Sequence, residues 1–259
     1  MRRHNLLLIF SVLGGLVLLF IIAPLAGMFL KGSGMAFSST IHEKEVLESI
    51  RLTIVISLVT TSIFAVFGVP LAYLLARYTF PLKNLVLAII DLPVVIPHTA
   101  AGIAILGFIS RDTIPGRIAS FIGIDFVGNP AGIGLAMAFV SVPFLVNAAR
   151  DGFISVPVRL EKAALSLGAG HFTVFRTISL PLAWRSIMTG FVMMFARGLS
   201  EFGAVVIIAY HPMITPVLIY ERFGTFGLKY AQPVAVLFVL VSLSFFVLLR
   251  FISSRKRNA

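Results

Sequence analysis

The chain alternates between long apolar runs and short polar segments. A helix needs about 20 mainly apolar residues to cross the roughly 30 Å hydrocarbon core of a bilayer. Six runs reach that length, one of them interrupted by prolines, so the pattern predicts six membrane-spanning helices and an all-α fold. The predicted spans are 6–30, 52–76, 85–109, 130–149, 182–210 and 233–252.

The first run, 6–30, follows a short basic amino terminus. A secretory signal peptide has an apolar core of about 7–15 residues, which is shorter than this run. We therefore interpret it as a retained span, with cleavage near the Ala23-Pro24-Leu25-Ala26 stretch as the alternative. The predicted organisation is an amino-terminal membrane helix over 1–30, a membrane unit over 48–252 that includes a polar loop at 155–181, and a basic tail over 253–259.

Composition agrees with a membrane protein. Of the 259 residues, 59% are hydrophobic and only 12% are charged, and the mean hydropathy is +1.04. A soluble domain carries about 25% charged residues, so this chain cannot cover its apolar residues with a soluble surface. There is no cysteine, which excludes disulfides and thiolate metal sites. No Gly-x-x-x-x-Gly-Lys-Ser/Thr sequence occurs, so ATP-driven work needs a separate ATP-binding subunit.

The net charge of +11 follows the predicted topology. With the amino terminus inside the cell, thirteen basic residues fall in inner segments and seven in outer loops, as the positive-inside rule requires. We therefore expect both termini and the loop at 155–181 on the cytoplasmic side, with basic residues contacting lipid headgroups rather than nucleic acid. The inner set is Arg2, Arg3, Arg77, Lys83, Arg150, Arg159, Lys162, Arg176, Arg185, Arg250, Arg255, Lys256 and Arg257; the outer set is Lys31, Lys44, Arg51, Arg111, Arg117, Arg222 and Lys229.

The polar loop at 155–181 is predicted to hold two short helices. Ser155 is placed to cap the first helix, and Pro157 is tolerated in a first turn. Gly168 and Gly170 are expected to end that helix, because glycine adopts positive φ without a steric penalty. A second short helix follows and ends where the next apolar span opens. The loop is too polar to cross a bilayer, so it is expected to form an ordered elbow between two spans.

Two charged residues fall inside the fifth predicted span. Arg197 and Glu201 stand four residues apart, so a continuous helix would place them one turn apart on the same face, where they can pair. A charge near the bilayer centre costs at least about 2.5–3.5 kcal/mol on insertion scales and therefore needs a partner or water. Two interpretations stay open: a structural ion pair, or a polar step, shared with Ser200, on a path through the membrane.

The third span contains a second polar group. In Asp91-Leu-Pro-Val-Val-Ile-Pro-His98-Thr99, two prolines four residues apart remove backbone hydrogen bonds and bend the segment. Broken helices inside membranes face a cavity or other protein. Asp91 either caps a helix that starts at Pro93 or belongs to a path with Pro97 and Thr99, and His98 is either a core histidine or part of that path. No second ligand stands at metal-binding spacing from His98, so the sequence predicts no metal site.

The polar loop resembles a known family. It is similar to the EAA loop of importer-type ABC permeases, whose coupling helices dock into a groove of an ATP-binding subunit. The residues that carry the resemblance are Glu161, Ala163, Ala164, Gly168, Ile178, Leu180 and Pro181, with Lys162 where the motif has alanine. A generic cytoplasmic helical hairpin is the alternative. A DNA-reading helix-turn-helix is disfavoured because both flanks enter the membrane.

Two stretches inside the predicted spans indicate a particular group within this family. Residues 91–103 and 196–204 look like those of molybdate and tungstate permeases, and sulfate permeases share a similar Glu-Phe-Gly-Ala element. The resemblance covers about 48–250 and implies the fold of a type I ABC importer permease. It further implies a homodimer, two cytosolic subunits that bind ATP and magnesium, and an external oxyanion-binding protein, with no cofactor on this chain.

The resulting hypothesis is a permease that imports molybdate or tungstate by alternating access and catalyses no reaction. The candidate path residues are Asp91, Pro97, His98, Thr99, Arg197, Ser200 and Glu201. A sulfate or other small-anion permease is the alternative. An ion-coupled secondary carrier is disfavoured because the elbow would have no use there and no inverted repeat is visible. An intramembrane enzyme is disfavoured because no paired carboxylates, His-Glu-x-x-His or Ser/His/Asp set occurs.

Overall fold

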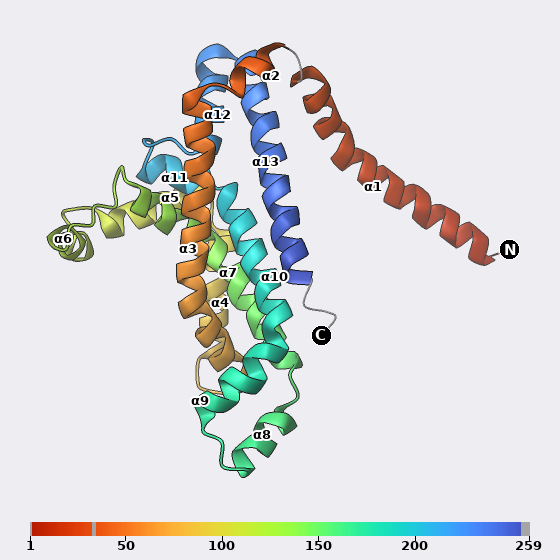
Figure 1. Cartoon of the computed structure of the whole chain (residues 1–259), viewed down its shortest axis with the longest axis vertical. Coiled ribbons are helices and arrows are strands. Elements are labelled where there is room, and N and C mark those ends of the chain that lie inside the picture. Colours follow the sequence, from red (N-terminus) through yellow and green to blue (C-terminus); the bar gives the residue numbers. More distant parts are fainter. Residues whose placement is uncertain (1, 33–34, 255–259) are drawn as a thin grey trace.

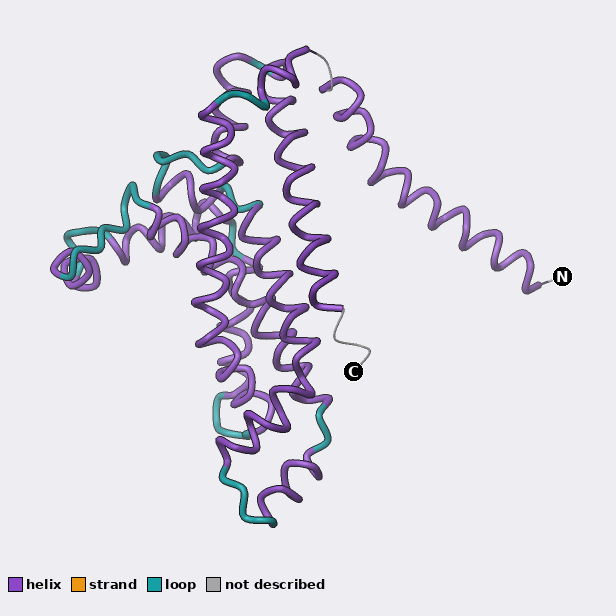
Figure 2. Tube along the Cα trace, in the orientation of Figure 1, coloured by secondary structure: helices purple, strands orange, loops and turns teal. Residues whose placement is uncertain are grey.

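The structure is a computed structural model that describes residues 2–32 and 35–254. Met1, residues 33–34 and residues 255–259 lie outside the described residues, and with them most of the predicted basic tail at 253–259. The described part of the chain consists of helices and the turns that join them (Figures 1 and 2). In chain order the helices are α1 (Arg2–Gly32), α2 (Met35–Thr40), α3 (Lys44–Arg77), α4 (Lys83–Val95), α5 (His98–Ile109), α6 (Ile114–Phe121), α7 (Pro130–Ser155), α8 (Val158–Ser166), α9 (His171–Val174), the π-helix η1 (Phe175–Ser179), α10 (Leu180–Leu199), α11 (Gly203–Ile208), α12 (Thr215–Phe226) and α13 (Leu228–Ser254).

Five helices of the described chain are long and apolar enough to cross a membrane, and the bent pair α4 and α5 makes a sixth span if it is counted as one. This agrees with the six predicted spans and identifies a multi-pass membrane protein. One of the five, His171–Leu199, joins α9, η1 and α10. The second helix of the polar loop was predicted as a separate element. It is instead the first turns of the fifth span.

A widened turn makes this continuity feasible. Leu180 donates its backbone hydrogen bond to the Phe175 carbonyl, five residues back, which is the π-helical pattern of η1. Pro181 follows at once and has no N–H to donate. Because the hydrogen-bond spacing has already shifted at η1, the helix passes through Pro181 without ending.

The bundle is built around α7, which packs along α10 on one side and α3 on the other. Small residues allow this approach. A Cβ on Gly152 would lie 2.5 Å from the Cβ of Ser186, and one on Gly190 would lie 2.9 Å from the Cβ of Ala148. Inside a membrane, helices associate through such close packing because lipid tails are as apolar as the side chains. The contact therefore requires glycine at both positions.

The third span is broken at one of its two prolines. α4 continues through Pro93, and the break falls at Ile96–Pro97. Ile96 is extended, with φ −75° and ψ 145°, because the residue before a proline is disfavoured in the helical region. The chain bends by 114° between α4 and α5. The prediction that Pro93 starts a helix capped by Asp91 is wrong, since both residues lie inside α4.

The fifth span is broken as well. α10 ends at Leu199 and α11 begins at Gly203, so the expected single helix over 182–210 is wrong. The cause is the carboxylate of Glu201, which accepts a hydrogen bond of 2.9 Å from the amide of Ala204. A side-chain oxygen in that position satisfies a free amide of a helix start. The apolar pattern could not show this end, because α11 is itself apolar.

The two interrupted spans meet at their breaks. α5 and α11 pack against each other and, in Figures 1 and 2, extend sideways from the bundle toward α6. A Cβ on Gly102 would lie 2.9 Å from the backbone of Ala204, and one on Gly203 would lie 2.7 Å from the Cβ of His98. Glycine thus brings the two backbones together where side chains of other residues would separate them.

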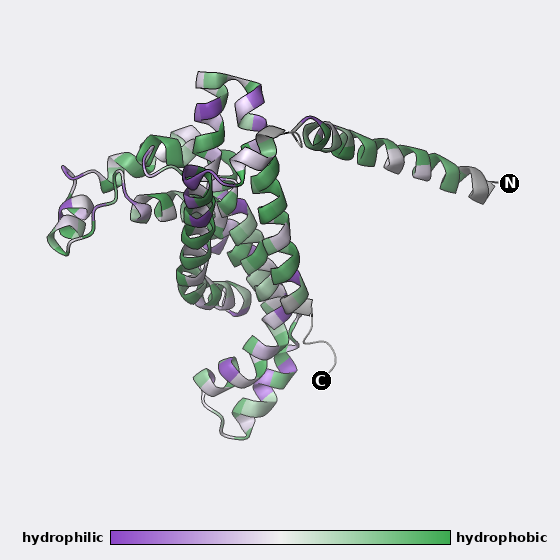
Figure 3. Ribbon diagram, turned by 45° about the horizontal axis from the view of Figure 1, so that its top comes forward, coloured by the Kyte–Doolittle hydropathy of each residue, from purple (hydrophilic) through white to green (hydrophobic). Residues whose placement is uncertain are grey.

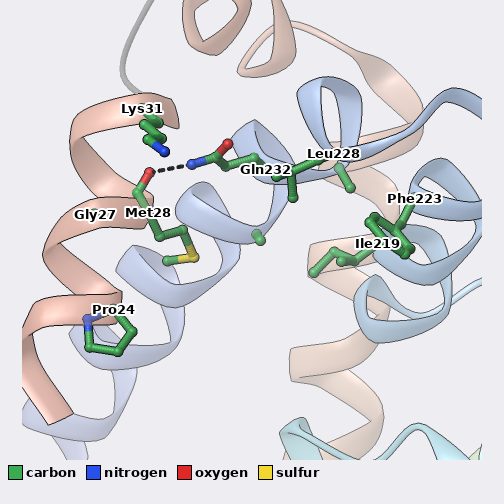
Figure 4. Close-up of a pocket in the computed structure, with 10 residues that line it drawn as sticks. Pro24, Gly27, Met28, Lys31, Ile219, Phe223, Leu228 and Gln232 are labelled. Atoms are coloured by element: carbon green, nitrogen blue, oxygen red, sulfur yellow. Dashed lines mark hydrogen bonds between the residues drawn. The ribbon is translucent and has the colours of Figure 1, made fainter. Parts of the chain in front are cut away.

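α1 lies apart from the bundle (Figure 1). None of its most apolar window is buried within the chain. It touches α13 near its last turn, where the Gln232 amide donates a 2.9 Å hydrogen bond to the Met28 carbonyl (Figure 4). Pro24 on α1 faces Ile219 and Phe223 of α12 across the same groove. The rest of α1 needs lipid or another protein to cover it.

Two segments predicted as loops, 110–129 and 211–232, contain the helices α6 and α12. Arg222 anchors α12 by donating to Glu43 at 2.6 Å and to Glu45 at 2.9 Å. In the loop after α6, hydrogen bonds from Arg111 and Ser120 hold the pKa of Asp125 below its usual value. Figure 3 shows hydrophilic residues gathered in such connecting segments, whereas α1 and α13 are mostly hydrophobic.

We predict opposite effects for two Gly→Ala changes in α5. Gly102→Ala should destabilise the protein by about 1–3 kcal/mol, because its Cβ would press on the Ala204 backbone, which cannot yield. Gly107→Ala is the matched control: nothing lies within 4 Å of its Cβ, so it should stabilise α5 by about 0.5–1 kcal/mol. Thermal unfolding in detergent measures both. Equal midpoints would contradict the close packing of α5 on α11.

Candidate functional site

The polar loop begins with a change of direction after α7. Ser155 does not cap α8 as predicted; its hydroxyl donates to the Gly152 carbonyl at 2.7 Å, within α7. Pro157 instead occupies the position before the first residue of α8. Its lack of an N–H is harmless there, because the first amides of a helix have no partner inside the helix.

Gly168 ends α8, as predicted, with a φ of +88°. The amide of Gly168 donates to the Leu165 carbonyl at 3.0 Å, and that of Ala169 donates to Ala164 at 3.1 Å. These two bonds form the Schellman arrangement that closes a helix around a left-handed residue. Gly170 has a φ of −73°, which any residue adopts. Its predicted role in ending α8 is therefore wrong, and Gly168 alone requires glycine in this turn.

Glu161 holds the loop against the bundle. Its carboxylate receives the Arg77 Nε at 2.9 Å on both oxygens, a second Arg77 nitrogen at 2.8 Å, and the Ser179 hydroxyl at 2.6 Å. Arg77 also donates to the Val156 carbonyl at 3.0 Å. Only 9% of the Arg77 side chain and 8% of the Glu161 side chain are exposed. This buried pair connects the end of α3, the start of α8 and η1.

The loop presents an apolar outer surface beyond that pair. Leu167 is 88% exposed and Phe172 75% exposed, and Leu160 is also exposed. Among the other predicted coupling residues, Ala163 and Pro181 are exposed and Ala164 is half-buried. Leu180 packs against the apolar cluster between α3 and α7. Glu161 is the one predicted coupling residue that is buried, so it is not part of this surface.

A second polar site lies where the two broken spans meet. Glu201 is fully buried. One of its oxygens accepts the Ala204 amide, and the other lies 2.9 Å from an Arg197 nitrogen and 2.9 Å from the Nδ1 of His98. The Nε2 of His98 lies 2.9 Å from the same Arg197 nitrogen. The Nδ1 of His98 also lies 2.8 Å from this nitrogen, so both ring nitrogens are within hydrogen-bond distance of Arg197.

Arg197 is paired and only partly exposed. The predicted pair with Glu201 is present, although α10 ends between the two residues. The carboxylate neutralises the guanidinium, and the Arg197 side chain keeps 21% exposure. Ser200 is exposed beside it, with its hydroxyl 3.4 Å from the second terminal nitrogen of Arg197. The cluster of Arg197, His98 and Glu201 is thus a mostly buried polar network with one edge on the surface.

Asp91 lies on an exposed part of α4, and its carboxylate accepts a 2.6 Å hydrogen bond from the Asn147 amide of α7. Pro97 and Thr99 are exposed on either side of His98, at the break between α4 and α5. The structure therefore divides the predicted path residues into two groups. His98, Arg197, Ser200 and Glu201 meet at the two breaks, whereas Asp91 joins α4 to α7.

The sequence did not predict three residues of these sites. Arg77 and Ser179 bind Glu161, and Asn147 binds Asp91. Arg77 was counted only as an inner positive charge, and the other two occur among apolar residues. Their partners stand 84, 18 and 56 residues away, so local spacing carries no signal for them. Among the described residues, no three His, Cys, Asp or Glu side chains are placed to hold a metal ion.

Residues 68–258 match the family of binding-protein-dependent transport system inner membrane components, and the chain belongs to this family. It is 42% identical to the molybdate/tungstate transport system permease protein WtpB of Thermococcus kodakarensis, over 99% of both chains. It is 43% identical to WtpB of Methanocaldococcus jannaschii, over 91% of this chain and 92% of the relative. A probable sulfate transport system permease protein of Mesostigma viride is 31% identical over 90% and 89%. The resemblance drawn from the motifs is confirmed.

Solved structures show the same fold. A bacterial alginate ABC transporter in complex with a pentasaccharide-bound periplasmic protein matches with a TM-score of 0.76 at 19% identity, over 99% of this chain and 97% of that chain. The MetNI methionine ABC transporter in an inward-facing conformation matches with a TM-score of 0.62 at 17% identity, over 81% and 93%. Together with the broken spans and the polar loop, these likenesses establish the type I ABC importer permease fold.

We predict that Glu161 stabilises the loop through Arg77. Glu161→Ala should leave a buried guanidinium unpaired and cost about 3–5 kcal/mol of local stability. Faster hydrogen–deuterium exchange of the α8 amides would measure this loss. Removing both charges as Arg77→Met/Glu161→Leu should recover much of it, because apolar residues of similar size fill the same space.

Lys162→Ala is the control for the Glu161 variants, since Lys162 is the exposed neighbour on the same helix. It should exchange as the unchanged protein does. If Glu161→Ala also exchanged at that rate, the ion pair would not be what holds the loop.

Proposed function

We propose that this chain is the transmembrane permease subunit of an ATP-driven importer of molybdate or tungstate. The observation that carries the proposal is the identity of 42–43% to WtpB proteins over 91–99% of this chain, on a fold shared with solved ABC importers. Sulfate permeases are the second candidate, and the identity to them is lower, at 31%. Molybdate and tungstate are tetrahedral dianions of nearly the same size, so the two remain joint candidates.

The proposed orientation places the loop end of the bundle in the cytoplasm, with both termini on that side. The positive-inside distribution of basic residues supports it. The partners would be two cytosolic ATP-binding subunits at the loop, which would hold ATP and magnesium, and an oxyanion-binding protein at the opposite end. The chain itself would bind no cofactor and no nucleic acid, and it would carry a solute rather than catalyse a reaction.

A second copy of the chain completes this proposal. Six spans without internal duplication would need a second copy to enclose a path. The most apolar part of α1 is not buried within the chain. Asp91 is exposed on a membrane span. A charge on lipid is costly, so Asp91 requires water or protein beside it. Two-fold symmetric pairs are the commonest assembly. A path between two copies would place water and protein beside Asp91.

The loop would couple ATP binding to the path. The exposed side chains of Leu167 and Phe172 would insert into the ATP-binding subunit, while the buried pair of Glu161 and Arg77 would transmit its movement to α3. Because α9, η1 and α10 are one helix, the same movement would reach the break at Ser200. The ATP-bound partners would favour one of the two access states by binding it more tightly.

The cluster of Arg197, His98 and Glu201 would form the wall of the path near the membrane centre. A bare arginine would hold a dianion too firmly, whereas transport needs sites that are weak enough to leave. Glu201 mutes the guanidinium, and the exposed edge of Arg197 with Ser200 keeps hydrogen-bond donors for an oxyanion. Glu201 is thus scaffold, and Arg197 would serve both roles.

The test of the function is uptake by vesicles that hold the purified chain with its ATP-binding subunits inside and the binding protein outside. We expect ATP-dependent accumulation of molybdate and tungstate, with sulfate at least about tenfold less efficient, since a site built for one ion discriminates in binding free energy. The detergent-corrected mass of the active complex should correspond to two copies of the chain. Preferred uptake of sulfate, or none of any oxyanion, would refute the assignment.

We predict that Gly168→Trp uncouples transport while leaving insertion and pairing intact. A side chain at φ +88° costs about 1–2 kcal/mol and projects into the surface that meets the partner. Stimulated ATP hydrolysis and co-purification of the ATP-binding subunit should both fall. Gly170→Ala is the control, because its φ of −73° suits any residue and nothing lies within 4 Å of its Cβ. Full uptake by Gly168→Trp would contradict the coupling role.

A further inference from the structure

Asp91 is a carboxylate without a cationic partner inside a membrane span. Among the described residues, no Arg, Lys or His lies within ion-pair distance of it, and its recorded contact is the 2.6 Å hydrogen bond from Asn147. Asn147 is neutral, so the negative charge stays uncompensated. This contrasts with Glu201, whose charge is shared with Arg197 and His98. A carboxylate left charged at this depth has to face water.

The position of Asp91 along the membrane is fixed by two helices. It lies eight residues after Lys83, the first residue of α4, and Asn147 lies eight residues before Ser155, the last residue of α7. At 1.5 Å per residue, each is about 12 Å from the loop end of its helix. The break that carries His98 comes later in the same span. Asp91 therefore lies between the Arg197 cluster and the loop end.

Asn147 is half-buried on a face of α7 that packs against α4. Val146, Ala149 and Phe153 point toward α3, and the close approach of α10 is made at Ala148 and Gly152.

Asn147 and Asp151 stand four residues apart, on one face of α7 that neither of those helices covers. Asp151 is 71% exposed at the end of this face. This face of α7 is thus polar, and its exposed acid at the loop end lies 3.8 Å from Arg150.

We propose that Asp91 is an anion-rejecting residue of the transport path, which keeps cytosolic oxyanions from re-entering when the path is open to the inside. The inference rests on the proposed function and on its orientation. An incoming dianion would first meet the donors at Arg197 and Ser200, and then a negative charge that disfavours any stay. The same charge would lower the occupancy of the path by sulfate, phosphate or product from the cytosol. Asn147 donates a hydrogen bond to this carboxylate without changing its charge.

The size of the effect depends on the charge of the anion. A unit charge about 6 Å from a dianion in bulk water changes its occupancy about tenfold, and that of a monoanion about threefold. A purely structural role for Asp91 would not distinguish anions by charge. The valence of the competing ion is therefore the informative variable.

The experiment measures molybdate uptake by the reconstituted complex in vesicles preloaded with sulfate, a dianion, or perrhenate, a monoanion of the same tetrahedral shape. Each variant is scaled to its own uptake into vesicles without preloaded anion. For Asp91→Asn, which keeps the hydrogen bond from Asn147 but removes the charge, the half-inhibiting concentration of lumenal sulfate should fall about tenfold and that of perrhenate about threefold. Asp91→Ser should give the same shifts, so the test survives if one variant fails to fold.

Three controls separate charge from structure. Asp91→Glu and Asn147→Ala keep a carboxylate and should retain the resistance to lumenal anions. Glu48→Gln removes one exposed negative charge from the opposite end of the bundle and should leave inhibition unchanged. Identical inhibition curves for Asp91→Asn and the unchanged chain would overturn the proposal, as would equal shifts for sulfate and perrhenate or the same shift in Asn147→Ala. If the unchanged complex imports no oxyanion into unloaded vesicles, the proposed function itself fails, which is a separate result.

Discussion

The membrane-embedded half of this protein depends on the burial of one carboxylate. Glu201 is fully buried, and a bare charge in that position would be prohibitively unstable. It is satisfied by an amide of α11, by Arg197 of α10 and by His98 of α5. Each of these groups is available because a span is broken nearby. The two breaks and the carboxylate therefore require one another: without the breaks Glu201 has too few partners, and without Glu201 the start of α11 lacks an acceptor.

A second buried carboxylate organises the loop by the same physics. Glu161 joins the end of α3 to α8 and η1 through Arg77 and Ser179. Both acids lie where the chain changes direction, and both bind an arginine that comes from a long helix. The loop is consequently fixed to the bundle at its inner side and free at its apolar outer side. A rigid attachment with an exposed contact surface is what a coupling element needs if movement of a partner is to reach the membrane.

The distribution of charge along the proposed path follows from these constraints. Arg197 is neutralised by Glu201 and offers donors without a strong field, whereas Asp91 has only a neutral amide beside it. A path that attracts an anion weakly in the middle and disfavours it toward the cytosol would favour release over retention. The exposed position of Asp91 and the uncovered α1 both point to surfaces that a single chain does not bury. In the proposed pair, a second copy would supply the other wall of the path.

The sequence alone determined the class of protein, the six apolar spans, the polar loop and the turn at Gly168, because these rest on local length, composition and backbone freedom. It also identified Arg197, Glu201 and His98 as unusual, since a charge or an imidazole among apolar residues is visible without a structure. It missed that α4 continues through Pro93, that the fifth span begins before residue 182, and that this span is broken before Tyr210. Those breaks are stabilised by hydrogen bonds that include contacts between distant segments, such as Glu201 with His98, and Asp91 with Asn147 links α4 to α7. Only the tertiary structure brings such partners together. The energy of a buried polar group depends on the groups around it in space, which its neighbours along the chain do not specify.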